Sequence, residues 1–415
     1  MSVSRPHQDP PARSYPPVLV LLTLAAGAFG IGTTEFAVSG LLPGIAAEFD
    51  VSFSVAGWAA TLYALGVFVG APLLIVVGRR FEQRRFLLVL MGLFVVGNLA
   101  TALGSSFGLV LVGRVVTALA HGAFLGTGSI LASRVVPPHR RTRAIAFMFT
   151  GLTLATLVGA PIATWVSTTW SWRLSFLGIG AIGVLTLACI LLCIPRGTAG
   201  EPLRLGAELR ALRNPQLLLA MLVTILGPAG FFTSITYIAP ITLDVTGTPE
   251  SWITFYLTVF GLGLFVGNLV GGRLADINLM GLLTWSLAML TAVLLVFWLA
   301  AGSVVVTLVA VFLMAATGFA TVSPIQRLVM ERAERAGAPN LAASMNIGMF
   351  NLGNAIGAWL GGVVIHAGLG SASPNLAGAA LAGAALVVAL LIARRARNDS
   401  ARDITHDDPA AATTV

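Results

Sequence analysis

The chain has 415 residues, of which 57% are hydrophobic and only 10% are charged, and its mean hydropathy is +0.92. Soluble domains carry about 25% charged residues, so this composition excludes an ordinary soluble protein and indicates a polytopic membrane protein. The net charge of +8 does not indicate nucleic-acid binding, because the basic residues, all of them arginine, lie mainly in short loops between apolar runs.

The apolar runs predict twelve membrane-spanning helices, because a helix needs about 20 mainly apolar residues to cross a bilayer. In chain order, the predicted spans are residues 18–42, 54–78, 86–104, 108–132, 144–167, 174–195, 216–240, 252–274, 280–301, 303–326, 341–366 and 373–393. The ninth and tenth spans almost touch at Gly302, which makes that joint the least distinct. The predicted fold class is therefore an all-α polytopic membrane protein with twelve transmembrane helices.

The longest polar interruption follows the sixth span and divides the chain into two six-helix halves. The predicted units are an N-terminal tail (1–17), a first half (18–195), a central loop (196–215), a second half (216–393) and a polar C-terminal tail (394–415). We expect the C-terminal tail to be disordered. Residues 203–212 form either a short amphipathic helix on the membrane surface or a plain linker. The first apolar run lacks an A-x-A cleavage signal, so we interpret it as a retained helix.

The arginines are distributed unevenly among the loops. All but two of the 24 basic residues lie in the even-numbered loops or in the terminal tails, and the exceptions are Arg114 and Arg173. Because positively charged loops stay in the cytoplasm, we expect both termini there and the loop at residues 241–251 outside. The predicted location is the inner membrane of a bacterium, with multiple passes.

The two halves share a short sequence repeat. LGVFVG at residues 65–70 in the second span recurs as LGLFVG at residues 262–267 in the eighth, with five of six residues identical. Parallel repeats occur in one class of transporters, whose substrate site lies near the midplane between the repeats. Chance similarity is the alternative in a chain so rich in leucine, glycine and valine.

Charged side chains inside the spans are the strongest functional signal. Glu35 is the only acidic residue in a predicted span, and an uncompensated charge at that depth costs at least ~2.5–3.5 kcal/mol. Arg114 and His121 are seven residues apart in the fourth span and share a helix face. Glu35 and Arg114 lie at matching depths, so they are either parts of a proton relay or a permanent ion pair. His121 is either a relay residue or a neutral, hydrogen-bonded interior side chain.

Other polar and aromatic residues also lie in the spans. Asn351 and Asn354 are three residues apart in the eleventh span, where they either line a cavity or join helices by hydrogen bonds. Phe36, Phe124 and Tyr237 are candidates for the wall of a substrate cavity, although a single aromatic residue more often serves packing. We expect these five residues to contribute to a substrate site.

The chain offers no signal of catalysis. Cys189 and Cys193 are four residues apart in one apolar run, where small hydrophobic side chains are the expected role rather than a metal site or a disulfide. The sequence contains no P-loop and no metal-ligand cluster. We therefore expect neither an enzyme nor a bound metal or cofactor.

Several motifs resemble those of the major facilitator superfamily, and more narrowly its twelve-span drug:proton antiporters, including the chloramphenicol-resistance and arabinose-efflux permeases. The motifs that carry the resemblance are GTTEFAVSGLLPGI (32–45), RVVTALAHGAFLG (114–126), PPHRRTRA (137–144), GLTLATLVGAP (151–161), WSWRLSF (170–176), YIAP (237–240) and GGRLAD (271–276). The resemblance covers the whole apolar length and implies alternating access, with efflux coupled to proton influx.

The resemblance also implies roles for particular residues. Arg114 matches the family's fourth-span arginine, which implies a part in proton transfer. The family's gating-loop motif, G-x-x-x-D-R-x-G-R-R, keeps Arg84 and Arg85 in its first copy and Gly272 and Asp276 in its second.

Both family motifs are altered in this chain. Arg80 and Gln83 occupy the aspartate and glycine positions of the first gating-loop copy, and the second copy lacks the arginines that follow. The antiporter motif of the fifth span keeps Gly159 and Pro161, the expected hinge residues, but lacks its glycine pair.

The preferred hypothesis is a proton-coupled exporter of small amphiphilic compounds, with phenicol-type antibiotics favoured. The alternatives are efflux of a sugar or metabolite and, in a different class, a non-transporting membrane sensor or scaffold. The expected proton-coupling residues are Glu35, Arg114 and His121, and the energy source is the proton gradient. The expected partners are a small-molecule substrate, protons and lipid but no nucleic acid, and we expect a monomer.

Overall fold

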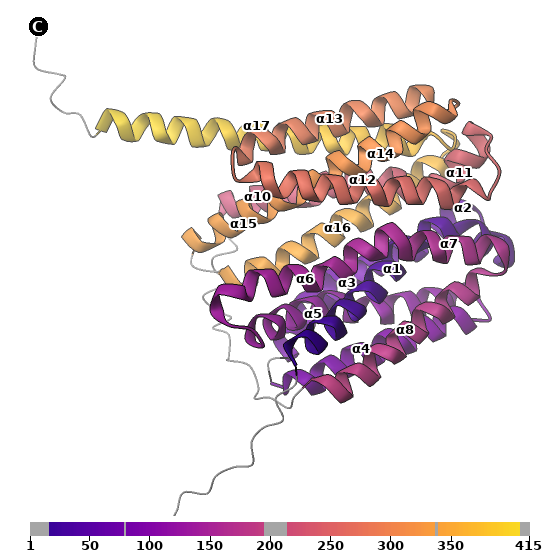
Figure 1. The fold of residues 1–415 in the computed structure, drawn as a ribbon. Coiled ribbons are helices and arrows are strands. Elements are labelled where there is room, and N and C mark those ends of the chain that lie inside the picture. The colour runs from indigo at the N-terminus through magenta and orange to yellow at the C-terminus, as the bar shows by residue number, and fades with distance from the viewer. Residues whose placement is uncertain (1–15, 79, 195–213, 337–338, 407–415) are drawn as a thin grey trace, which may run out of the picture.

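The computed structural model describes residues 16–78, 80–194, 214–336 and 339–406, and its elements in these ranges are helical (Figure 1). These elements make up twelve helical stretches that are long and apolar enough to span a membrane, which confirms the predicted fold class. The predicted N-terminal tail up to residue 15 and most of the central loop, including residues 203–212, lie outside the described residues.

The first half contains ten helical segments that make six spans. They are α1 (Pro17–Phe49), α2 (Phe53–Ala56), α3 (Trp58–Gly78), α4 (Gln83–Leu103), α5 (Phe107–Arg134), η1 (Pro138–Arg140), α6 (Arg141–Leu154), η2 (Ala155–Gly159), α7 (Ala160–Thr169) and α8 (Trp172–Cys193). The α6, η2 and α7 segments follow one another directly and form the fifth span.

The described residues of the second half also make six spans. Its segments are α10 (Pro215–Ile235), α11 (Ile238–Pro240), η3 (Ile241–Thr246), α12 (Trp252–Ala275), α13 (Leu279–Ala300), α14 (Val304–Ala320), α15 (Val322–Ala336), α16 (Pro339–His366) and α17 (Ser373–His406). In Figure 1 the indigo-to-magenta helices of the first half form one group and most orange-to-yellow helices form another beside it.

Polar residues at the short joints explain where many helices begin. The side chains of Ser106, Asn214 and Asn278 accept hydrogen bonds from backbone N–H groups in the first turns of α5, α10 and α13. At the Gly302 joint, α13 ends at Ala300 and Ser303 caps the start of α14, so the ninth and tenth spans are separate helices. Such caps satisfy N–H groups that have no partner within the helix.

Three predicted boundaries are wrong, and each helix is longer than expected. The first span continues to Phe49, where Asp50 ends it in a left-handed conformation with φ 50°. Residues 327–335, predicted as a loop, belong to α15, an amphipathic helix whose charged positions do not interrupt helical hydrogen bonding. The C-terminal tail, predicted to be disordered from residue 394, is helical as far as His406 because alanine and arginine are strong helix formers. This part of α17 extends beyond the bundle in Figure 1.

The two copies of the short repeat make corresponding helix contacts in α3 and α12. Gly66 of the first copy allows α3 to approach α5, where a Cβ atom would lie 3.2 Å from the carbonyl oxygen of Val115. Gly263 of the second copy allows α12 to approach α14 at the carbonyl of Phe312 in the same way. The second span therefore packs on the fourth as the eighth packs on the tenth, and small residues permit both contacts.

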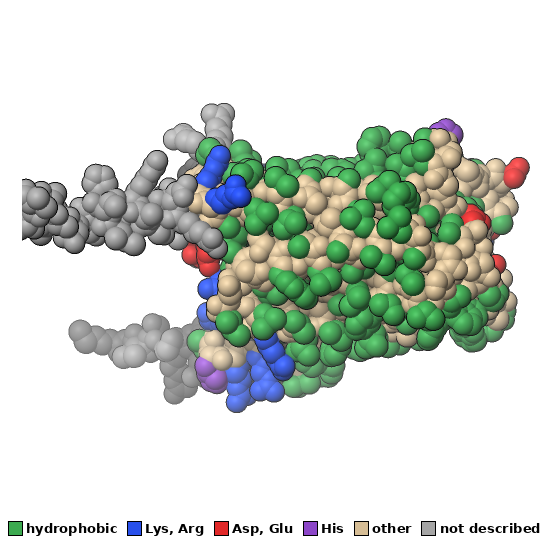
Figure 2. Space-filling model, turned by 90° about the horizontal axis from the view of Figure 1, so that it is seen from above, with side chains coloured by type: hydrophobic (Ala, Val, Ile, Leu, Met, Phe, Trp, Pro, Cys, Tyr) green, Lys and Arg blue, Asp and Glu red, His purple; other side chains and the backbone are tan. Residues whose placement is uncertain are grey.

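The arginines gather at one end of the bundle, as the sequence predicts. Figure 2 shows them at the left-hand end, the end at which α1 begins and α17 leaves the bundle in Figure 1. Arg173, one of the two exceptions, lies at the other end, where its Nη2 contacts Glu48 Oε1 at 2.7 Å. The same guanidinium donates to the carbonyls of Ala102 (2.6 Å) and Gly104 (2.7 Å). Arg173 therefore joins α1, α4 and α8 at the end opposite the arginine-rich one.

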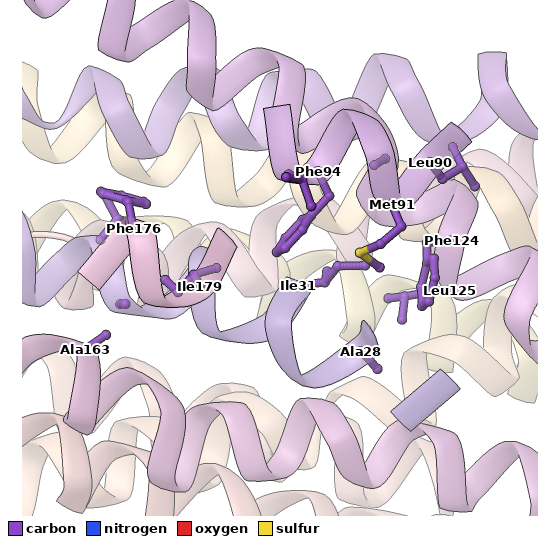
Figure 3. Close-up of a cluster of buried hydrophobic side chains, with 14 of the residues drawn as sticks. Ala28, Ile31, Leu90, Met91, Phe94, Phe124, Leu125, Ala163, Phe176 and Ile179 are labelled. Carbon is purple, nitrogen blue, oxygen red and sulfur yellow. The ribbon is translucent and has the colours of Figure 1, made fainter. Parts of the chain in front are cut away.

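Apolar side chains fill the interior of the first half. Phe124 of α5 is fully buried there and points toward Met91 of α4 in Figure 3. Gly27 of α1 makes room for this ring, because a Cβ atom at that position would overlap it. Phe124 thus joins three helices of one half.

Candidate functional site

A cavity of about 690 Å³ lies between the two halves. Its walls come from α1, α5, α6 and η2 of the first half and from α10, α12, α14, α15 and α16 of the second. At the arginine-rich end the wall includes Arg327, whose side chain is 48% exposed. Most of the lining surface is apolar. The cavity therefore has the size of a small-molecule site and reaches toward the arginine-rich end.

At the opposite end the two halves are in direct contact. The hydroxyl of Ser54 in α2 donates a 2.8 Å hydrogen bond to the carbonyl of Gly362 in α16. The ring of Tyr237 is buried beside them, and its hydroxyl donates to the carbonyl of Ala358 at 2.9 Å. Gly57 leaves space for this hydroxyl, because a Cβ atom there would overlap it. The structure is thus closed at this end, and a single substitution at Gly57 would disturb the closure.

Glu35 lies at the inner limit of the cavity, a little past the middle of α1. Its Oε1 atom accepts a long hydrogen bond of 3.4 Å from Asn354 Nδ2 of α16. This contact joins a carboxylate of the first half to an amide of the second, so a change in how the halves fit together must change the partners of Glu35.

Phe36, the next residue, packs against aromatic rings of the second half. Its ring centroid lies 6.2 Å from that of Phe232, 6.4 Å from that of Phe260 and 6.3 Å from that of Phe319. Phe350 contacts both Phe232 and Phe319. These five phenylalanines, the aromatic cluster, provide offset and edge-on ring surfaces beside Glu35.

Arg114 is fully buried and does not form the ion pair with Glu35 that the matching depths suggested. Among the described residues, no carboxylate oxygen lies within the 4.0 Å that defines an ion pair with it. Its Nε donates to the carbonyl of Ala59 at 3.1 Å, and its Nη1 donates to the carbonyl and the hydroxyl of Thr34, each at 3.0 Å. Its Cζ lies 4.1 Å from the centre of the Tyr63 ring. Backbone oxygens and a ring face thus compensate its charge.

His121 lies at the cavity wall and is linked to Tyr63 of α3. The Tyr63 hydroxyl and His121 Nδ1 are 3.1 Å apart, and both side chains are buried. The hydrogen-bonded interior role expected as one alternative is therefore present, and the position on the cavity wall leaves a relay role open to test.

The predicted substrate residues divide into two groups. Phe36 and Asn351 line the main cavity, and Asn354 contacts Glu35 at its limit. Phe124 belongs to the packed interior of the first half, and Tyr237 belongs to the closed end, so the structure does not bring these two to the cavity. Both are aromatic residues in a span, a property that packing residues share.

The expected gating-loop residues do not meet across the halves. Arg84 and Arg85 lie in the first turn of α4 rather than in a loop, where Arg84 donates to the carbonyl of Leu191 and Arg85 pairs with Glu82. Asp276 at the end of α12 pairs with Arg327 at 3.1 Å, within the second half. Gly272 of α12 has open space where a side chain would be.

The expected hinge residues coincide with a break in helical geometry. Residues Ala155–Gly159 form a π-helical turn, and Pro161 stands in the first turn of α7 directly after it. A Cβ atom at Gly159 would overlap the Thr33 hydroxyl of α1, so the glycine permits close approach. π-helical turns often mark functional sites in helices, but whether the segment bends during a transport cycle stays a prediction.

Three polar residues of this site are not among those predicted from the sequence. Thr34 and Tyr63 hold Arg114, and the Thr34 hydroxyl also donates to Asn98 Oδ1 of α4 at 3.0 Å. All three are polar side chains inside spans, the same signal that pointed to Glu35. Their mutual contacts depend on how α1, α3, α4 and α5 pack, which hydropathy does not reveal.

Two helical halves around one central cavity, closed at one end, define the architecture of a membrane transporter. Residues 24–340 match the family model of the Major Facilitator Superfamily. The chain is 42% identical to the inner membrane transport protein YdhP of Escherichia coli (strain K12) over 90% of this chain and 96% of that protein. It is 33% identical to the putative transporter AraJ of the same strain, over 92% and 97%, and 35% identical to a chloramphenicol resistance protein of Streptomyces lividans, over 90% and 95%. The chain belongs to the Major Facilitator Superfamily and is a multi-pass membrane transporter.

Proposed function

We propose that this transporter exports small amphiphilic compounds, phenicol-type antibiotics among them, in exchange for protons. The observation that carries the proposal is the position of Glu35 at the limit of the central cavity, beside the aromatic cluster and in contact with Asn354 of the other half. Three features therefore meet at one place: a proton-binding group, a surface for an apolar ligand and the contact between the halves.

The proposed cycle uses the difference between wet and dry surroundings at Glu35. A carboxyl group that is shielded from water is less costly when neutral than when ionised. When the cavity opens to the cytoplasm, water and the incoming compound stabilise the ionised form, and Glu35 releases its proton. When the opposite end opens, an external proton neutralises Glu35 and displaces the compound. Since each ligand favours a different state of one group, export and proton influx are coupled.

The character of the cavity supports an amphiphilic substrate over a sugar. Its lining surface is mostly apolar, and Phe36, Phe319 and Phe350 present ring surfaces to it. A sugar needs many polar partners, whereas an aromatic amphiphile needs apolar contact and a few hydrogen bonds. The 35% identity to a chloramphenicol resistance protein supports phenicols as the first compounds to test.

Expression in a sensitive bacterial host is expected to raise tolerance to chloramphenicol severalfold and to lower its accumulation in the cells. The measurement is growth inhibition together with uptake of labelled drug, with and without a protonophore. The control is the same chain carrying Glu35→Gln. Unchanged tolerance combined with export of arabinose or another sugar would replace this proposal by sugar efflux.

The proposed direction of export requires the arginine-rich end to face the cytoplasm. In a variant without Cys189 and Cys193, a cysteine at the exposed residue Glu250, between η3 and α12, is expected to react with an impermeant maleimide in intact cells. A cysteine at the exposed residue Arg140 is the matched control and should react only after permeabilisation. The reverse pattern would contradict the orientation.

A further inference from the structure

A second, much smaller cavity adjoins the main one at Glu35. It measures about 10 Å³, and Glu35 and Phe36 line both cavities. This volume corresponds to one water molecule. We name it the polar chamber, because its wall includes six polar side chains: Glu35, Ser39, Tyr63, Arg114, Thr236 and Asn354.

The polar chamber lies between a donor and an acceptor that do not touch each other. Arg114 Nη2 is buried and has no hydrogen-bond partner among the described residues. The Glu35 carboxylate has one long hydrogen bond of 3.4 Å, from Asn354, and forms no ion pair with Arg114 within the described part of the chain. A space for one water beside an unpaired guanidinium N–H and a carboxylate meets the requirements of a buried water site, which needs two to four polar partners.

We propose that the polar chamber binds one water molecule, held between Arg114 Nη2 and the Glu35 carboxylate, and that this water delivers protons to Glu35. The second part rests on the proposed function. Glu35 faces the main cavity on one side and the chamber on the other, so a proton that arrives through the chamber can leave through the cavity. In the transfer, one O–H bond of the protonated water breaks and one O–H bond forms on Glu35, while the electron pair stays on the water oxygen.

The rest of the chamber wall supports a route from the closed end rather than from the cavity. Val38, Ile235 and Thr236 line it together with Ala60 of α3. Ile235 and Thr236 directly precede Tyr237, which packs at the closed end. Separation of the halves at that end would uncover the chamber to outside water, whereas the main cavity reaches toward the arginine-rich end.

The first test is a structure of the wild-type protein and of Ala60→Val at a resolution that shows ordered water. The two added methyl groups fill a space of about 10 Å³. Wild type is expected to show a density peak within hydrogen-bond distance of Arg114 Nη2 and of a Glu35 oxygen, and Ala60→Val is expected to lack it. Ala64→Val is the matched control, because Ala64 is buried on the same helix but lines neither cavity. A wild-type map without the peak would overturn the water site.

The second test measures transport by the same variants in proteoliposomes loaded with chloramphenicol. Ala60→Val is expected to slow export driven by a pH gradient about tenfold, the effect of losing roughly one buried hydrogen-bonded contact. Exchange of labelled for unlabelled drug without a gradient should stay within about twofold of wild type, because it needs no net proton transfer. A merely structural defect would slow both reactions. Should Ala60→Val fail to insert, Ala60→Cys adds one heavy atom and is tested in the same way.

The outcomes separate this inference from the proposed function. Wild-type export that ignores the pH gradient would overturn proton coupling and the delivery role, and the density map would still decide the water site. Normal gradient-driven export by Ala60→Val, with the water displaced, would overturn the delivery role alone.

Discussion

The Glu35→Gln variant is expected to lose pH-driven export down to the rate of protein-free vesicles while still folding and inserting. Glutamine keeps the size and hydrogen-bonding capacity of the side chain but cannot bind or release a proton at these pH values. Among the described residues, no other carboxylate lines either cavity, so no second carboxylate there can replace it. The measurement is drug export from proteoliposomes under an imposed pH gradient.

Two companion variants define what the loss means. Glu35→Asp retains a carboxylate on a shorter side chain and should keep part of the export rate. His121→Ala removes a side chain that lines the cavity and contacts Tyr63, and it should impair coupling less completely. Drug binding by Glu35→Gln should persist, because the aromatic cluster is untouched. Wild-type export rates in Glu35→Gln would leave Glu35 with only a structural role, through its contact with Asn354.

The spans could be predicted from the sequence because hydropathy alone selects helices in a bilayer. Glycines of the short repeat could also be interpreted, since Gly66 and Gly263 mark the same contact in the two halves. The lengths of α15 and α17 do not follow from hydropathy, because charged residues after an apolar run usually indicate a loop. At a membrane surface a charged segment remains helical when its residues are good helix formers.

The partners of the buried charges were harder to predict, and the reason is geometric. Matching depth along two helices does not fix the rotation of either helix, and rotation decides which side chains face each other. Arg114 therefore meets two backbone carbonyls and the Tyr63 ring rather than Glu35. A backbone carbonyl is present at every residue, so no sequence pattern can single out Ala59 as a partner.

The same limit applies to aromatic residues. Phe36 and Phe124 are both phenylalanines in predicted spans of the first half, yet one lines the cavity and the other fills the packed interior. Only the contacts of the whole bundle distinguish them. Phe36 is distinguished by its contacts with the second half, whose rings approach it from α10, α12 and α14.

A disulfide between cysteines at Ser54 and Gly362 is expected to abolish export, and reduction is expected to restore it. These positions belong to different halves, and a Cβ atom at Gly362 would lie 3.3 Å from the Ser54 hydroxyl oxygen, which is within reach of a disulfide. The bond would hold the closed end shut, so the transporter could load from the arginine-rich end but not release outside. Export is measured in proteoliposomes before and after dithiothreitol, in a background without Cys189 and Cys193.

The control for this cross-link joins two positions at the same end but within one half. Ser371 Oγ donates to Asp244 Oδ2 at 2.6 Å, and both residues are in the second half. If the halves move as units, a cysteine pair at these two positions can form a disulfide without blocking the cycle. The reduced Ser54/Gly362 variant controls for crowding of the Tyr237 hydroxyl, which a side chain at Gly362 would contact. Alternating access requires the closed end to open once per cycle. Undiminished export by the oxidised Ser54/Gly362 variant would therefore contradict alternating access.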